Sequence, residues 1–136
     1  MLPEKTTLIA ITGATLGQVS LLEIDCCTNQ SIVGIIENSE VPFEYIYPFI
    51  KTEIKSIISN QTGAAQQHIN LTDVRNTKIL LPESNVLKAY QKIVSPMYKM
   101  ITNLYFENKK LEKMRDTLLP KLISGEIRVE EAIEVE

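Results

Sequence analysis

The chain has 136 residues and a formal net charge of −3, and 44% of its residues are hydrophobic. This length is typical of one domain, and the composition is sufficient for a modest core. The sequence has no apolar run of about 18 residues. Its first residues, MLPEKTTLIAI, lack the basic and then apolar order of a secretory signal. We therefore expect a soluble, cytoplasmic protein that does not enter a membrane.

Residues that usually bind metals or catalyse reactions are scarce. Cys26 and Cys27 are adjacent, which is too close for an ordinary disulfide, and the sequence has no second cysteine pair for a zinc site. The only histidine is His68, and Ser20 and Ser31 have no histidine near them in the sequence. The pattern of a catalytic set is therefore missing. We expect no metal, no cofactor and no enzymatic activity.

Charge is distributed unevenly along the chain. Residues 1–50 contain one basic and six acidic residues, residues 51–121 contain twelve basic and six acidic residues, and residues 122–136 contain one basic and five acidic residues. A basic block thus lies between two acidic ones, and such local fields decide which partners bind. The block favours an acidic partner such as nucleic acid. The alternative is that its lysines only solvate a helix.

The first part of the chain predicts short strands followed by helices. Runs rich in β-branched and aliphatic residues are separated by turn residues, which is the pattern of a small β-meander. These runs occupy residues 6–12, 18–24 and 31–37. Residues 42–59 place apolar side chains at helical spacing and predict a helix that Pro48 kinks or splits. A polar loop then precedes a helical turn at 71–76 and a strand at 77–82.

The rest of the chain predicts a long helical segment. Ser84 is a suitable N-cap, and a Ser-Pro pair at 95–96 has the sequence of a second helix start. This segment is therefore either one helix kinked at that pair or two helices nearly in line. Pro120 predicts that the helix stops at residue 119, and Gly125 predicts a turn after it. A short strand at 126–129 and an acidic tail follow.

A heptad pattern runs along this helical segment. Intervals of three and four residues alternate, and seven of the nine positions are apolar, which indicates a narrow stripe that packs against another helix. Asn108 and Arg115 interrupt the stripe, and a polar residue at such a position fixes register and partner number at a cost in stability. The alternative is that the stripe packs on the chain's own sheet, with these two side chains at its rim. The residues of this seam are Val94, Met97, Ile101, Leu104, Asn108, Leu111, Arg115, Leu118 and Leu122.

The end of the helical segment carries a distinctive sequence. ENKKLEKMRDTLLPKLISGEI, residues 107–127, resembles the C-terminal segment of the specificity subunit of type I restriction-modification enzymes. The matching positions are Glu107, Asn108, Leu111, 114–116, 118–122 and 124–127. Upstream, TGAAQQHIN resembles a loop of that family, and TKILLP resembles the strand that leads into its helix. That loop matches at Gly63, Gln66, His68 and Ile69, and departs from the family's usual residues at Ala64, Ala65 and Gln67.

The resemblance implies a DNA-sequence reader without catalysis of its own. In that family, two target-recognition domains each read half of a split DNA site, and paired antiparallel helices hold them apart and dock methyltransferase subunits. The implied partners are double-stranded DNA and a methyltransferase subunit, with a homodimer or a pair with another specificity-subunit half formed through the long helix. Only 83 residues precede Ser84, fewer than a domain of this family normally has, which implies either a truncated specificity subunit or a fragment whose complementing half lies elsewhere.

The polar loop at 60–70 offers chemistry that suits DNA. Reading DNA requires cationic side chains on phosphates, and amide or guanidinium groups on base edges. The loop is rich in amides, and basic residues flank it. The alternative is an ordinary surface loop in which His68 is structural. The candidate DNA-binding residues are Lys51, Lys55, Asn60, Gln61, Thr62, Gly63, Gln66, Gln67, His68, Asn70, Arg75 and Lys78.

Together these patterns predict an α+β chain, in which a small, partial target-recognition domain of short strands and helices is followed by a long coiled-coil-type helix. We predict three parts: residues 1–83 for DNA recognition, 84–124 for helix pairing and methyltransferase docking, and 125–136 as a short strand and acidic tail. Two alternatives remain open. One is a dimerisation module that joins a specificity complex without reading bases, and the other is an unrelated α+β domain that binds a different acidic partner.

Overall fold

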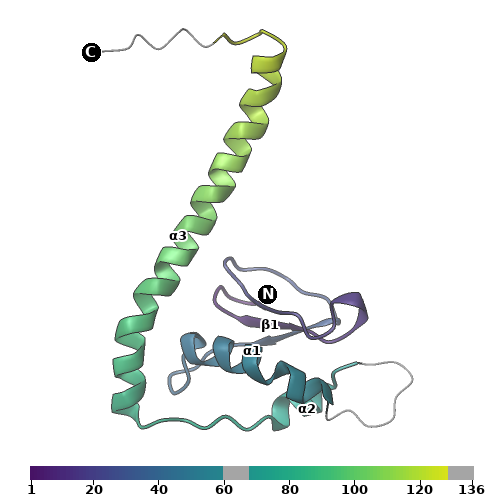
Figure 1. Ribbon diagram of the computed structural model, residues 1–136. Coiled ribbons are helices and arrows are strands. Elements are labelled where there is room, and N and C mark those ends of the chain that lie inside the picture. Colours follow the sequence, from purple (N-terminus) through teal and green to yellow (C-terminus); the bar gives the residue numbers. More distant parts are fainter. Residues whose placement is uncertain (60–67, 129–136) are drawn as a thin grey trace. The chain divides into compact units, whose positions relative to one another are not determined.

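The computed structural model describes residues 1–59 and 68–128, and the chain divides into two compact units, Met1–Ser95 and Pro96–Glu136. Figure 1 shows a small sheet and two helices in the first unit, and a long helix that continues into the second. The predicted α+β class is confirmed. The elements are β1 (Thr7–Ala10), η1 (Gly13–Thr15), β2 (Val19–Leu21), β3 (Ile32–Ile35), α1 (Phe43–Ser59), α2 (Leu71–Asn76) and α3 (Ser84–Ile123).

The sheet is antiparallel, with the strand order β2-β1-β3. Thr7 of β1 pairs with Leu21 on one side and with Ile35 on the other. The three strands lie inside the three runs that the sequence predicted, and they are shorter because pairing extends over only three or four residues. Successive side chains point to opposite faces of such a sheet, so one face is available for a helix.

Helix α1 provides most of the core. Its isoleucines at 46, 50, 54 and 57 recur at helical spacing and are all buried, as the sequence predicted. They form one cluster with Ile9 of β1, Ile69 and Val74. Each fully buried side chain of this size contributes about 1.5–3 kcal/mol relative to an exposed one. The first unit therefore has a hydrophobic core of its own.

Pro48 neither splits α1 nor leaves its backbone unsatisfied. A proline has no N–H, so the carbonyl four residues earlier, that of Glu44, loses its helical donor. The hydroxyl of Tyr90, from α3, donates to this carbonyl oxygen at 3.0 Å. The neighbouring Ser95 hydroxyl donates to the Glu44 carboxylate at 2.6 Å, although Glu44 is only 5% exposed. Two side chains of α3 thus bind a single buried residue of α1.

Gly17 lies in a turn that only glycine fits well. Its φ is +80°, and a Cβ added there would lie 2.5 Å from the Cδ1 atom of Ile58. A residue with a Cβ atom is less stable than glycine in the left-handed backbone region by about 1–2 kcal/mol. We expect Gly17→Ala to lower the free energy of unfolding by about 1–2 kcal/mol through strain alone, and by more if Ile58 cannot shift. Urea unfolding measures this, with Gly13→Ala as the control, because Gly13 also has a positive φ but open space around it.

The long helix does not stop where the sequence predicted. One continuous helix, α3, contains both Pro96 and Pro120, so the predicted end at residue 119 is wrong. The turn after Pro120 is retained because the Ser124 N–H donates to the Pro120 carbonyl at 2.9 Å. Gly125, with a φ of +75°, then ends the helix as predicted. Pro96 and Pro120 each lack the N–H that a helix interior uses, and α3 continues through both.

Two predicted strands are absent from the described residues. Residues 77–82 have no regular secondary structure, and the Leu80 carbonyl accepts a hydrogen bond from the Tyr45 hydroxyl at 2.7 Å instead of a strand partner. Residues 126–128 form bends and irregular chain, and Val129 lies outside the described range. β-branched residues favour a strand, but a strand also requires a neighbour to pair with. Within the described part of the chain, no helix is both long and apolar enough to cross a membrane.

Candidate functional site

The described DNA-binding candidates all lie on the surface of the first unit. Lys51 and Lys55 are exposed one turn apart on α1, and the Lys51 ammonium lies 5.5 Å from the centroid of the Tyr47 ring. Arg75 is exposed in the last turn of α2, and Lys78 is exposed after it. His68 and Asn70 are exposed immediately before α2. Asn60, Gln61, Thr62, Gly63, Gln66 and Gln67 lie outside the described residues.

Ile69 anchors the end of the candidate loop. It is 1% exposed, and its N–H donates to the Ile11 carbonyl at 2.9 Å, just beyond β1. Its two neighbours, His68 and Asn70, are therefore held at the surface. Asn70 directly precedes α2, yet its side chain does not cap that helix among the described residues. Sequence reasoning missed the anchoring role of Ile69, although a single apolar residue between polar neighbours was a signal for it.

Lys78 lines a groove that acidic residues also line. The groove has a volume of about 330 Å³, and the acidic residues are Glu53 of α1 and Asp73 of α2. Carboxylates close to an ammonium reduce the positive potential that it presents to a phosphate. Lys55 and Arg75 form no ion pair with any described residue. Arg75 is thus a stronger candidate for a phosphate contact than Lys78.

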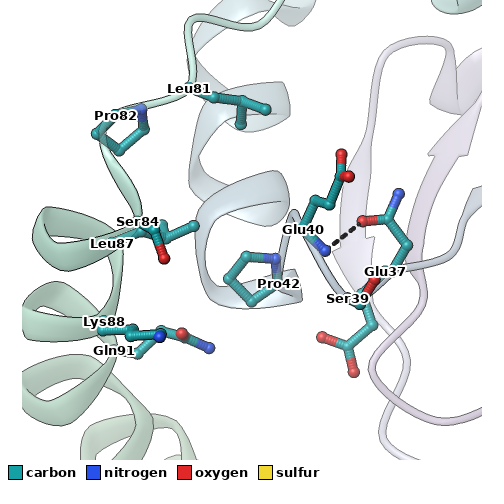
Figure 2. A pocket seen from close by; sticks show the side chains of 11 residues that line it. Glu37, Ser39, Glu40, Pro42, Leu81, Pro82, Ser84, Leu87, Lys88 and Gln91 are labelled. Atoms are coloured by element: carbon teal, nitrogen blue, oxygen red, sulfur yellow. Dashed lines mark hydrogen bonds between the residues drawn. The ribbon is translucent and has the colours of Figure 1, made fainter.

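A second groove in the first unit is lined by residues of the segment 37–42, by Leu81 and Pro82, and by the first turns of α3 (Figure 2). Its volume is about 680 Å³. The Glu37 carboxylate accepts the Phe43 N–H at 2.9 Å, and the Asn38 side-chain oxygen accepts the N–H groups of Glu40 and Val41 at 2.9 Å each. These side chains thus hold the start of α1. No group of three or more metal-binding side chains exists among residues 1–59 and 68–128.

The apolar residues of the predicted seam are exposed in the second unit. Met97, Ile101, Leu104, Leu111, Leu118 and Leu122 have between 38% and 56% of their surface exposed. Val94, which belongs to the first unit, is half-buried. Asn108 is exposed and makes no hydrogen bond through its side chain to a described residue. The Arg115 guanidinium binds the Asp116 carboxylate, with an Nη2–Oδ1 distance of 2.7 Å.

Further apolar residues flank this seam. Met100, Tyr105, Met114 and Leu119 are between 45% and 59% exposed, and they occupy the heptad positions on either side of the stripe. Sequence reasoning missed them because it counted only the two central positions of each heptad. None of residues 96–128 is buried. The helix in this unit therefore has no core of its own, and most helices in proteins depend on such packing for their stability.

Comparisons with known proteins identify the family. The model of the family described as "Type I restriction modification DNA specificity domain" matches residues 1–114, and the chain belongs to this family. The resemblance inferred from residues 107–127 and from the loop before α2 is thus confirmed. This chain is a specificity-subunit domain of the type I restriction-modification systems.

Two curated relatives illustrate the similarity. The chain is 33% identical over 87 residues to the type I restriction enzyme MjaIX specificity subunit of Methanocaldococcus jannaschii. The matched region covers 64% of this chain and 20% of the relative. It is 32% identical over 119 residues to the type I restriction enzyme HindI specificity subunit of Haemophilus influenzae. Here the matched region covers 84% of this chain and 26% of the relative. The chain thus spans about a fifth to a quarter of the length of these relatives.

Proposed function

We propose that this chain is a non-catalytic module that reads DNA sequence in a type I restriction-modification system and assembles through α3. Membership of the specificity-domain family is the observation that carries this proposal. The partners we propose are double-stranded DNA, a methyltransferase subunit and a second copy of this chain. Residues 1–83 would read DNA, residues 84–124 would pair and dock the methyltransferase, and residues 125–136 would be a tail.

The surface around the loop before α2 supports DNA binding. Lys55 and Arg75 are exposed without an ion pair among the described residues, so their charge is available for phosphates. Asn70 and the amides at 66 and 67 offer donor and acceptor groups for adenine edges. Cations that position the backbone and amides that read bases are the two parts a sequence reader requires.

The exposed seam supports assembly. A helix with an uncovered apolar stripe and no core of its own gains stability from a second helix. A pair of identical chains joined by a twofold axis would cover the same residues on both. The second candidate function, an interaction module that does not read bases, rests on this seam alone.

Substitutions of the basic residues and of the amide residues distinguish a DNA-reading function from an interaction module that does not read bases. A random-sequence duplex pool first selects the preferred site, and binding to that site is then measured against salt concentration. We expect Arg75→Ala with Lys55→Ala to weaken binding to all sequences and to lower the slope of log affinity against log salt by about 2. Gln66→Ala with Gln67→Ala would instead reduce the preference for the selected site by about 1–3 kcal/mol per lost base contact, with the slope unchanged.

The control removes the same charge elsewhere. Lys88→Ala with Lys92→Ala changes two exposed lysines of α3. This variant should leave the salt slope and the preference for the selected site unchanged. If the unmodified chain binds no duplex at low salt, even with the methyltransferase subunit present, the DNA-reading function is wrong. Intact self-association in the same sample would then favour the interaction module.

A further inference from the structure

Strand β3 lies at one edge of the sheet, and its outer side is open. The Ile11 N–H donates to the Ser31 carbonyl at 2.9 Å, and in an antiparallel pair every second residue bonds to the same neighbouring strand. The backbone groups of Gly34 and Ile36 therefore point away from β1. Neither residue forms a backbone hydrogen bond with any residue in the part of the chain that the structure describes. The edge thus presents unpaired N–H donors and carbonyl acceptors.

The sequence of this edge does not protect it. Proteins usually block an exposed edge strand with a charged residue, a proline or a bulge, because an unprotected edge pairs with other chains. Residues 31–36, SIVGII, contain no charged residue and no proline, and the pairing of β3 with β1 keeps one register throughout. Ile36 is 52% exposed. We therefore expect another polypeptide segment to cover this edge.

An apolar pocket lies beside the open edge. Its volume is about 210 Å³, and its lining includes Ile35, Ile36, Ile79, and Phe49 and Ile50 of α1. Ile35 packs against the hydrophobic core, so the pocket lies on the face of the sheet that α1 covers. A strand paired with β3 would place alternate side chains on this same face, next to Ile35. The pocket has the position that such a side chain would occupy.

The edge and the pocket together specify an extended peptide. In strand addition, main-chain hydrogen bonds at a sheet edge give affinity, and pockets for alternate side chains give selectivity. The lining of this pocket selects an aliphatic side chain. A second copy of this chain fits less well, because its own β3 presents Val33 and Ile35 on this face, and both already pack against their own core. A second copy would therefore leave the pocket empty.

We propose that the open edge of β3 binds a strand from a part of a specificity subunit outside the region matched here, with an aliphatic side chain in the pocket. The matched regions are 20% and 26% of the two curated relatives, so most of each relative has no counterpart in this chain. A strand from that remainder would extend the three-stranded sheet by one strand. The contact uses neither the candidate DNA-binding residues nor the seam, so it is tested separately from the proposed function.

Overlapping synthetic peptides from the whole HindI specificity subunit serve as probes, each of about ten residues, the upper length of a typical strand. We expect binding by a peptide from outside the matched region that has aliphatic residues at alternate positions. Fluorescence anisotropy gives its Kd. Hydrogen–deuterium exchange of the complex should show new protection of the Gly34 and Ile36 amides, because the peptide pairs with them.

Two matched pairs of variants make the test specific. Ile36→Pro removes an edge N–H and should raise the peptide Kd at least about fivefold, whereas Ile36→Val keeps the N–H and should change the Kd less than about twofold. Ile79→Lys places an ammonium in the pocket wall and should raise the Kd at least about tenfold. Leu80→Lys changes the next residue, which is 87% exposed and does not line the pocket, and should leave the Kd unchanged. Urea unfolding verifies that each variant is folded.

Several results would overturn the inference. One is that no peptide from outside the matched region binds, and another is that a bound peptide leaves the Gly34 and Ile36 amides unprotected. Equal binding by the unmodified chain and by the Ile36→Pro and Ile79→Lys variants is a third. Binding only by peptides from inside the matched region would identify a second copy as the occupant and would also contradict the proposal.

Discussion

Leu104→Asp combined with Leu111→Asp is expected to abolish self-association of the chain. Both leucines lie at the centre of the seam and are about half exposed in the single chain, at 50% and 54%. A fully exposed leucine that becomes buried contributes about 1.5–3 kcal/mol, so covering the exposed half of each contributes about half as much, and four of them in a homodimer contribute about 3–6 kcal/mol. Their loss raises the Kd of the dimer by about two to four orders of magnitude. Sedimentation velocity over a range of concentrations measures this change.

Two further variants make this result specific to the seam. Asn103→Asp with Thr117→Asp adds the same charge at two exposed positions of α3 opposite the seam and should leave the dimer intact. Asn108→Leu should keep the fold and change the number of chains in the assembly or their register, because a polar side chain at this position restricts both. Identical sedimentation of the Leu104 and Leu111 variant and the unmodified chain would refute pairing through the seam.

Tyr90→Phe combined with Ser95→Ala is expected to destabilise the first unit by about 3–5 kcal/mol, the cost of leaving a buried charged group and a buried carbonyl without donors. Glu44 would lose both hydrogen bonds that it receives from α3. Burial raises the pKa of the Tyr90 hydroxyl, and the Glu44 carboxylate raises it further. The protonated, donating form is thus favoured in the folded state. Its contribution is complete below about pH 10, the ordinary pKa of tyrosine, and is lost as pH rises through the raised value.

Pro48 provides an internal control for this prediction. Pro48→Ala restores an N–H that can donate to the Glu44 carbonyl, so the Tyr90 hydroxyl is no longer its required donor. We therefore expect Tyr90→Phe to cost about 1–3 kcal/mol in the natural sequence and much less in the Pro48→Ala background. Urea unfolding of the four proteins gives this coupling energy. Equal costs of Tyr90→Phe in both backgrounds would show that the hydroxyl does not compensate for the proline.

The parts of the fold that depend on local pattern were predictable. The isoleucines of α1 repeat at helical spacing and are buried, and the three strands lie within the predicted runs. The two failures have different physical reasons. Residues 77–82 contain strand-forming residues but have no strand to pair with, and α3 continues past Pro120 because the Ser124 N–H still donates to the Pro120 carbonyl. The donor that replaces the missing Pro48 N–H comes from Tyr90, forty-two residues away, which no local pattern reveals.

The candidate site was only partly predictable from the sequence. Amide and lysine content pointed to the loop and its flanks, but sequence reasoning could not find that Glu53 and Asp73 line the same groove as Lys78, because these residues come from separate elements.

The central claim is that a second helix stabilises α3. Hydrogen–deuterium exchange of the α3 amides tests this claim most directly. Because none of residues 96–128 is buried, the amides of residues 97–122 should exchange rapidly in the monomer. Exchange is measured at concentrations below and above the association midpoint found by sedimentation. We predict strong protection of residues 97–122 above the midpoint and little below it, with the amides of β1 and α1 protected at both. Equal exchange of α3 at the two concentrations would contradict the claim.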